Sequence, residues 1–198
     1  MAGSPPESLL RQARHLATRD PATLDQASLR RAVSTAYYAL FHRLVRDASA
    51  LLAGGDPTLE LLLARAFVHA EMKNVCALFL SRGPRPVVVA TLYPTLDVPG
   101  ELERVATAFV ALQGARHDAD YGNDRDFSST EALGEVERSE EAFRDWCTIR
   151  PRVLPETSAA LWLALGIQPV LRTVTPSEQE CVRLFLALLV LKKGLHDR

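Results

Sequence analysis

Residues 30–42 read RRAVSTAYYALFH, and this stretch decides the fold. Val33, Tyr37 and Leu40 recur every three or four residues, which is the spacing of the apolar face of an α-helix. The same face extends in both directions, and its members are Leu29, Val33, Tyr37, Leu40, Leu44, Ala48 and Leu51. The pattern predicts one long amphipathic helix that begins between residues 22 and 25 and is stopped by the glycine pair at 54–55.

The same stretch carries a second, mostly polar row. Its members are Arg31, Thr35, Tyr38 and His42. A cation, a hydroxyl, a phenol and an imidazole in one row suit a phosphate-bearing ligand. The alternative is that these groups lie at the edge of a helical bundle and satisfy one another's hydrogen bonds. The stretch by itself leaves both readings open.

Helical periodicity also covers the flanking sequence as far as residue 149. The predicted helices are one from Pro5 to about Arg19 with Ser4 as N-cap, one that opens at Asp56-Pro57 and bends near Glu71 before Gly83, one from about Gly100 to Tyr121, and one from the capping box Ser128–Glu131 to about Ile149. The proline-rich residues 83–99 predict a connector, in which Val87–Val89 could form a short extended piece. Five helices with modest connections predict an all-α, antiparallel up-and-down bundle.

The composition becomes more aliphatic after Pro151. Residues 155–166 suggest a short helix, and the capping box at 175–178 predicts a last helix that ends at residues 192–194. Because residues 184–191 are apolar nearly all round, this helix should be covered on both sides, by the bundle or by a second copy of the chain. We therefore expect a bundle at 1–150 and a C-terminal helical extension at 151–198.

Charge and cysteine content narrow the class of protein. The 198 residues carry a formal net charge of -1, so a general electrostatic capture of nucleic acid is not indicated. A local basic groove is still compatible with this net charge. The three cysteines form no C-x-x-C pair and predict neither a disulfide framework nor a cysteine-rich zinc site. Residues 1–7 do not resemble a secretory signal, and the longest apolar run is shorter than the roughly 20 residues that span a bilayer. We expect a cytoplasmic protein that does not enter a membrane.

Residues 116–121, RHDADY, form a second dense polar cluster. On a helix, Arg116 lies one turn from Asp120, and His117 lies one turn from Tyr121. A functional reading gives Arg116 the task of holding a phosphate and gives His117 or Tyr121 the task of handling a proton. The alternative is an Arg-Asp pair followed by a tyrosine that ends the helix. If the two polar rows share a groove, Tyr38 or His42 should reach Arg116 or Asp120.

Three motifs together resemble the HEPN family, a helical domain of higher eukaryotes and prokaryotes that binds nucleotides. They are R-x5-YYA-x-FH in Arg31–His42, RAFVH in Arg65–His69, and LQ-x-ARH-x-ADY in Leu112–Tyr121. The similarity spans roughly Pro5 to Ile149 in the order that the family shows. Residues after Pro151 lie outside it.

The resemblance implies a helical bundle, often a homodimer, whose catalytic members cut RNA without a metal. Those members use an arginine and a histidine that are separated by four to six residues. Here the nearest equivalent is Arg116 with Tyr121, while Arg65 and His69 have only three residues between them. A phenol, with an ordinary pKa of about 10, is a poorer acid-base group at neutral pH than an imidazole with a pKa of about 6.5. The departure puts nuclease activity in doubt.

We therefore expect a binding or regulatory module for RNA or a nucleotide, with degenerate or absent nuclease activity and no cofactor. Two rivals are a metal-independent endoribonuclease, as the toxin partner of a nucleotidyltransferase antitoxin, and a helical assembly scaffold. The expected catalytic residues are Arg116, His117 and Tyr121, and the expected ligand-binding residues are Arg31, Tyr38, His42, His69 and Asp120. No H-E-x-x-H pair occurs, and we expect no metal site.

Overall fold

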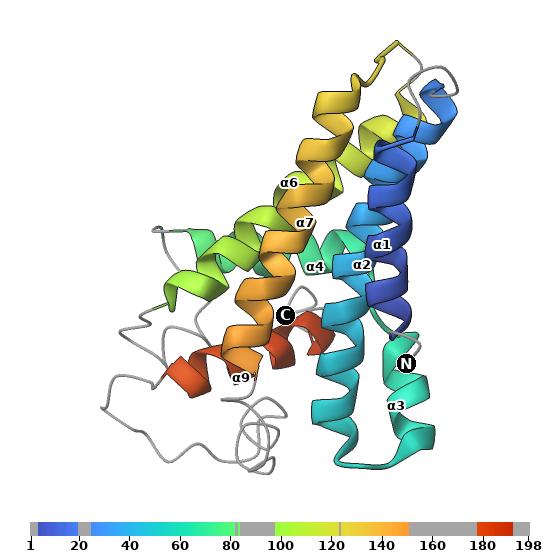
Figure 1. The fold of residues 1–198 in the computed structure, drawn as a ribbon. Helices are drawn as coiled ribbons and strands as arrows, with labels where there is room; N and C mark the ends of the chain where they lie inside the picture. The colour runs from blue at the N-terminus through green and yellow to red at the C-terminus, as the bar shows by residue number, and fades with distance from the viewer. Residues whose placement is uncertain are drawn as a thin grey trace. The chain divides into compact units, whose positions relative to one another are not determined.

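The computed structural model describes residues 4–19, 25–81, 83, 98–122, 124–150 and 178–191. Within these ranges the chain forms seven α-helices and no strand (Figure 1). The helices are α1 Pro5–Ala17, α2 Gln26–Ala53, α3 Pro57–Ala64, α4 His69–Leu80, α6 Gly100–Tyr121, α7 Ser129–Ile149 and α9 Glu178–Leu191. The all-helical prediction is confirmed for the described chain.

The predicted helix ends at α1, α2 and α7 follow from local chemistry. Ser4 and Glu7 form a capping box at the start of α1, in which the Ser4 amide donates to the Glu7 carboxylate at 2.7 Å. Gly54 and Gly55 follow α2 with φ of 59° and 97°, a left-handed conformation that ends a helix and favours glycine. The Ser128 amide donates to Glu131 at 2.8 Å, which forms the predicted capping box before α7.

The predicted bend near Glu71 lies elsewhere. The α3 helix ends at Ala64 and α4 begins at His69, so the break occupies residues 65–68 and Glu71 lies in the first turn of α4. None of the α3 side chains is buried, and Leu61 and Leu62 are 66% and 59% exposed. The sequence thus predicted an interruption but placed it too late, and of the two helices only α4 buries side chains.

The chain divides into two compact units, 1–43 with 108–144 and 44–107 with 145–198. The first unit contains α1, the first part of α2, the second part of α6 and most of α7. The Tyr37 and Phe109 rings join α2 to α6 with centroids 5.5 Å apart, and the Ser139 hydroxyl of α7 donates to the Ala36 carbonyl at 2.9 Å. Both contacts are buried, so they define the core of this unit.

The second unit buries the last helix. The Phe185 ring of α9 lies 5.1 Å from that of Phe79 in α4 and 6.3 Å from that of Trp146 in α7. The buried side chains of α9 are Cys181, Val182, Leu184, Phe185, Leu186, Leu188 and Leu189. The prediction that this helix is covered is confirmed, and the cover comes from its own chain, so its apolar character does not require a second copy.

A buried carboxylate organises the polar part of the second unit. The Trp146 indole donates to Asp47 at 2.8 Å, and the Arg150 Nε atom lies 3.1 Å from the same carboxylate. The Asp47 side chain is 4% exposed. This arrangement, named here the Asp47 cluster, neutralises a charge that would otherwise be costly to bury.

Several predictions concern residues outside the described ranges. They are the extended piece at 87–89, the short helix at 155–166 and the capping box at 175–178. The proposed boundary at 150–151 stays a prediction for the same reason. Of the helices that are described, none combines the length and the apolar character that a membrane span needs.

Candidate functional site

The polar faces of α2 and α6 meet inside the first unit. The Arg116 Nη2 group donates to the Tyr38 hydroxyl at 2.8 Å, and the Ser34 hydroxyl donates to Asp120. Tyr38 and Ser34 are one turn apart on α2, and Arg116 and Asp120 are one turn apart on α6, so the two helices run antiparallel at this level. The prediction that Tyr38 reaches Arg116 is confirmed.

Arg116 is tied to its own helix as well. Its Nε atom lies 2.6 Å from Asp120 Oδ2, in an i, i+4 ion pair whose side chains are 15% and 27% exposed. Since Asp120 also accepts from Ser34, the carboxylate is held from two helices. We refer to Ser34, Tyr38, Arg116, Asp120 and Tyr121 as the Arg116 cluster.

Two phenol rings flank the guanidinium group. The Arg116 Cζ atom lies 5.4 Å from the centroid of Tyr38 and 5.4 Å from that of Tyr121, within the range of a cation–π contact. Desolvation lowers the pKa of Arg116, but the hydrogen bond to Tyr38 and the nearby Asp120 charge outweigh it, and the pKa rises above its ordinary value. The guanidinium group is held by the Tyr38 hydroxyl and the Asp120 carboxylate and lies close to two aromatic rings.

His117 and Tyr121 lie at the solvent side of this arrangement. Both residues are exposed, Tyr121 by 62%, and their ring centroids are 5.2 Å apart. The pairing predicted for these two positions on one helix strip is confirmed. An exposed imidazole next to an exposed phenol can contact a ligand, but neither group is held against the other by a described hydrogen bond.

The other expected ligand residues are distributed differently. Arg31 is exposed, and no described residue forms a hydrogen bond or an ion pair with it. The His42 ring is exposed and stacks on Tyr38 with centroids 6.2 Å apart; desolvation by this neighbourhood lowers the pKa of His42 below its ordinary 6.5. His69 belongs to the second unit, where it is the first residue of α4. The structure thus joins Tyr38, Arg116, Asp120 and Tyr121 directly, and His42 through Tyr38.

The sequence reasoning missed Ser34 and Arg30. The predicted polar row contained Thr35, which is 5% exposed, whereas the strip that faces α6 is Arg30, Ser34 and Tyr38, spaced by four residues. Arg30 donates to the carbonyls of Asp118 and Ala119 in the last turn of α6 and to that of Arg125 beyond it, and so ties the end of α6 to α2. The signal that could have identified this strip is the recurrence of a polar residue at every fourth position.

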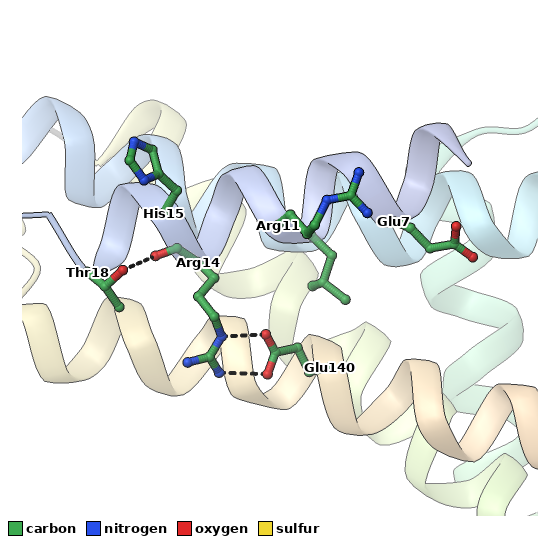
Figure 2. A pocket seen from close by; sticks show the side chains of 7 residues that line it. Glu7, Arg11, Arg14, His15, Thr18 and Glu140 are labelled. Carbon is green, nitrogen blue, oxygen red and sulfur yellow. Dashed lines mark hydrogen bonds and ion pairs between the residues drawn. The ribbon is translucent and has the colours of Figure 1, made fainter. Parts of the chain in front are cut away.

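A surface pocket of about 460 Å³ lies along α1, and no residue of the Arg116 cluster lines it (Figure 2). Its lining residues are Glu7, Leu10, Arg11, Arg14, His15, Thr18 and Glu140. Arg14 forms a two-pronged ion pair with Glu140, both bonds 2.6 Å long, which joins α1 to α7. Figure 2 shows the Arg11 and His15 head groups directed away from this pair and away from each other, so they do not converge on one ligand.

No group of three or more His, Cys, Asp or Glu side chains in the described part of the chain is placed to hold a metal ion. In comparisons with known proteins, the chain matches no protein-family model, no curated protein and no solved structure. The features of this chain that point to a function are therefore the geometry of the Arg116 cluster and the motifs that contain it.

Proposed function

We propose that this chain is a HEPN-like binding or regulatory module that holds a phosphate-bearing ligand, RNA or a nucleotide, at the Arg116 cluster. The observation that carries the proposal is the guanidinium group of Arg116, which is held by Tyr38 and Asp120 and lies close to the exposed ring of Tyr121. Arginine presents five N–H donors in a rigid plane that matches phosphate oxygens. Asp120 and Tyr38 engage its Nε and Nη2 groups, and no described residue hydrogen-bonds to Nη1.

The same geometry favours binding over cleavage. Metal-independent RNA cleavage needs a group that accepts a proton from the 2′-hydroxyl and another that donates to the leaving oxygen. Tyr121 stands at the position where the catalytic members of the HEPN family carry a histidine. His117 follows Arg116 directly and is exposed, and no described hydrogen bond orients its imidazole. Arg116 therefore serves binding, and among the described residues no proton acceptor and donor are placed together for cleavage.

Asp120 limits the affinity that we expect. Its carboxylate already compensates the Arg116 charge at 2.6 Å, so an incoming phosphate has to compete with it. The net charge of -1 supplies no general attraction for a polyanion. We expect weak binding whose affinity falls with salt, because each phosphate contact releases counterions.

The test is the fluorescence anisotropy of a labelled single-stranded RNA oligomer, with ATP as competitor, at low salt. Arg116→Ala should weaken binding about tenfold or more, since it removes a charged hydrogen-bond donor. Arg104→Ala is the matched control, because Arg104 is likewise an arginine of α6 that pairs with an aspartate, Asp145, but in the second unit. Asp120→Asn should tighten binding, because it removes the competing charge while keeping a side chain of the same size.

Two outcomes would overturn the proposal. Absence of binding to RNA and to ATP at low salt would leave the helical scaffold as the better account. RNA cleavage without a metal that disappears in Arg116→Ala and in Tyr121→Phe would instead establish the endoribonuclease, and a nucleotidyltransferase antitoxin would become the partner to seek. The homodimer stays a proposal, and light scattering of the full chain should report twice its mass.

A further inference from the structure

Tyr121 is an unusual aromatic residue in this chain. Of the Phe, Tyr and Trp side chains that the structure describes, only Tyr121 is exposed, and its exposed fraction is 62%. An exposed tyrosine ring presents more apolar area to water than the side chain of a typical surface residue. It also lies at the last residue of α6, directly beside the Arg116 guanidinium group.

The neighbours of Tyr121 restrict its movement. The Arg116 guanidinium lies over the ring, and the His117 ring lies 5.2 Å from it at an interplanar angle of 51°. Arg116 is itself tied to Tyr38 and Asp120. The backbone is secured too, because the Gly122 amide donates to the Asp118 carbonyl at 2.9 Å and Arg30 donates to the Ala119 carbonyl at 3.0 Å. The ring is thus ordered before any ligand arrives.

We propose that Tyr121 is a stacking platform for an unpaired base of the ligand, an inference that rests on the proposed function. A ring that is already ordered loses little conformational entropy when a base stacks on it. Every base has a π face, so stacking binds bases without selecting a sequence. The ligand is therefore held by two different contacts, phosphate at Arg116 and an unpaired base at Tyr121.

The antiparallel register places a further cation at the same level. Tyr38 pairs with Arg116 and Ser34 with Asp120, so one turn earlier on α2 corresponds to one turn later on α6. Arg31 is on that turn of α2, and it is exposed with no described ion-pair partner. If a base of the ligand stacks on Tyr121, the Arg31 guanidinium lies at a similar height along the bundle and is available for a neighbouring phosphate.

The experiment compares three RNA probes with the full-length protein by fluorescence anisotropy. The probes are a single-stranded octamer, the same octamer as a duplex, and an octamer in which the central nucleotides lack bases. The single strand should bind most tightly. Replacing Tyr121 by Leu should weaken its binding about 5- to 100-fold, the range for loss of one stacked base. Tyr121→Phe and Tyr121→Trp should retain it, because both keep a ring.

The variants and probes separate failure of this inference from failure of the proposed function. If Tyr121→Leu leaves binding unchanged, or the octamer without bases binds as tightly as its parent, stacking is wrong while phosphate binding at Arg116 stands. If no probe binds the unmodified protein, the proposed function itself fails. Retention of binding by Tyr121→Trp excludes a mere loss of folding in Tyr121→Leu, and circular dichroism of each variant checks that its helices are intact.

Discussion

The Arg116 cluster of the first unit and the Asp47 cluster of the second are built from the same components. Each holds a charged side chain from one helix against an aromatic residue and an opposite charge. The Asp47 side chain is 4% exposed and lies beside the buried Trp146. The Arg116 side chain is 15% exposed, but its neighbour Tyr121 is 62% exposed. The Asp47 carboxylate is closed off from solvent, although its partner Arg150 is 37% exposed, whereas the Arg116 cluster presents an aromatic ring to solvent.

This difference separates a structural charge from a charge that can serve a ligand. A buried carboxylate with its partners in place matters for stability mainly because removal of a partner would leave a buried charge uncompensated. The Arg116 cluster has the same internal partners, yet it keeps an aromatic ring and an unused guanidinium edge available. Substitutions in the Asp47 cluster should therefore change stability alone, whereas those in the Arg116 cluster should change stability less and binding as well.

The largest effect is expected for Asp47→Ala. Removal of the carboxylate leaves the Trp146 indole without its acceptor and Arg150 without its counter-charge, at a cost of about 3 kcal/mol in the free energy of unfolding. Urea denaturation measures it. Asp145→Ala is the control, since its partner Arg104 is 61% exposed and the loss should stay below about 1 kcal/mol. Equal losses in the two variants would contradict the closed character of the Asp47 cluster.

Arg116→Ala should be second in size. It removes the hydrogen bond to Tyr38 and two cation–π contacts and leaves Asp120 with Ser34 as its described partner, a loss of about 1 to 2 kcal/mol. Thermal unfolding should show the decrease, together with the loss of RNA binding described above. Arg116→Lys should not restore either property, because an ammonium group cannot contact Asp120 and Tyr38 in one plane. Full rescue by lysine would show that charge alone matters here.

Ser34→Ala should cost about 1 kcal/mol, the typical net contribution of one intramolecular hydrogen bond. Ser34 is 2% exposed and donates to Asp120, so its loss loosens the carboxylate from α2. Ser8→Ala removes an exposed acceptor of Arg11 and should change the unfolding free energy by less than about 0.5 kcal/mol. A Ser34 effect as small as this control would mean that α2 does not position Asp120.

The smallest effect concerns His42 and pH. Desolvation lowers the pKa of His42 in the folded chain, so the unfolded chain binds the proton more readily. Stability should therefore decrease as the pH falls below the ordinary 6.5 of the imidazole, and be unaffected by this group at higher pH. His42→Gln should flatten that part of the profile in urea titrations at a series of pH values. An unchanged profile would assign the pH dependence to other groups.

Local chemistry made most of the helices predictable. The Ser4 and Ser128 capping boxes and the Gly54–Gly55 pair act within one helical turn, so their sequence signals needed no tertiary information. The bend predicted near Glu71 was misplaced because apolar residues continue at helical spacing across the break at residues 65–68. Leu61 and Leu62 are exposed, and periodicity cannot distinguish a face that is covered from one that is not.

For the candidate site, the sequence by itself determined which residues share a helical strip, and therefore that Arg116 lies beside Asp120 and His117 beside Tyr121. Only the tertiary structure decided that α2 presents Arg30, Ser34 and Tyr38 to α6 and leaves Arg31 in solvent. The reason is rotational. Adjacent residues are about 100° apart around a helix, so the rotation of α2 against its neighbour decides which strip faces α6. That rotation is set by packing of Tyr37 on Phe109, a contact between residues distant in the chain.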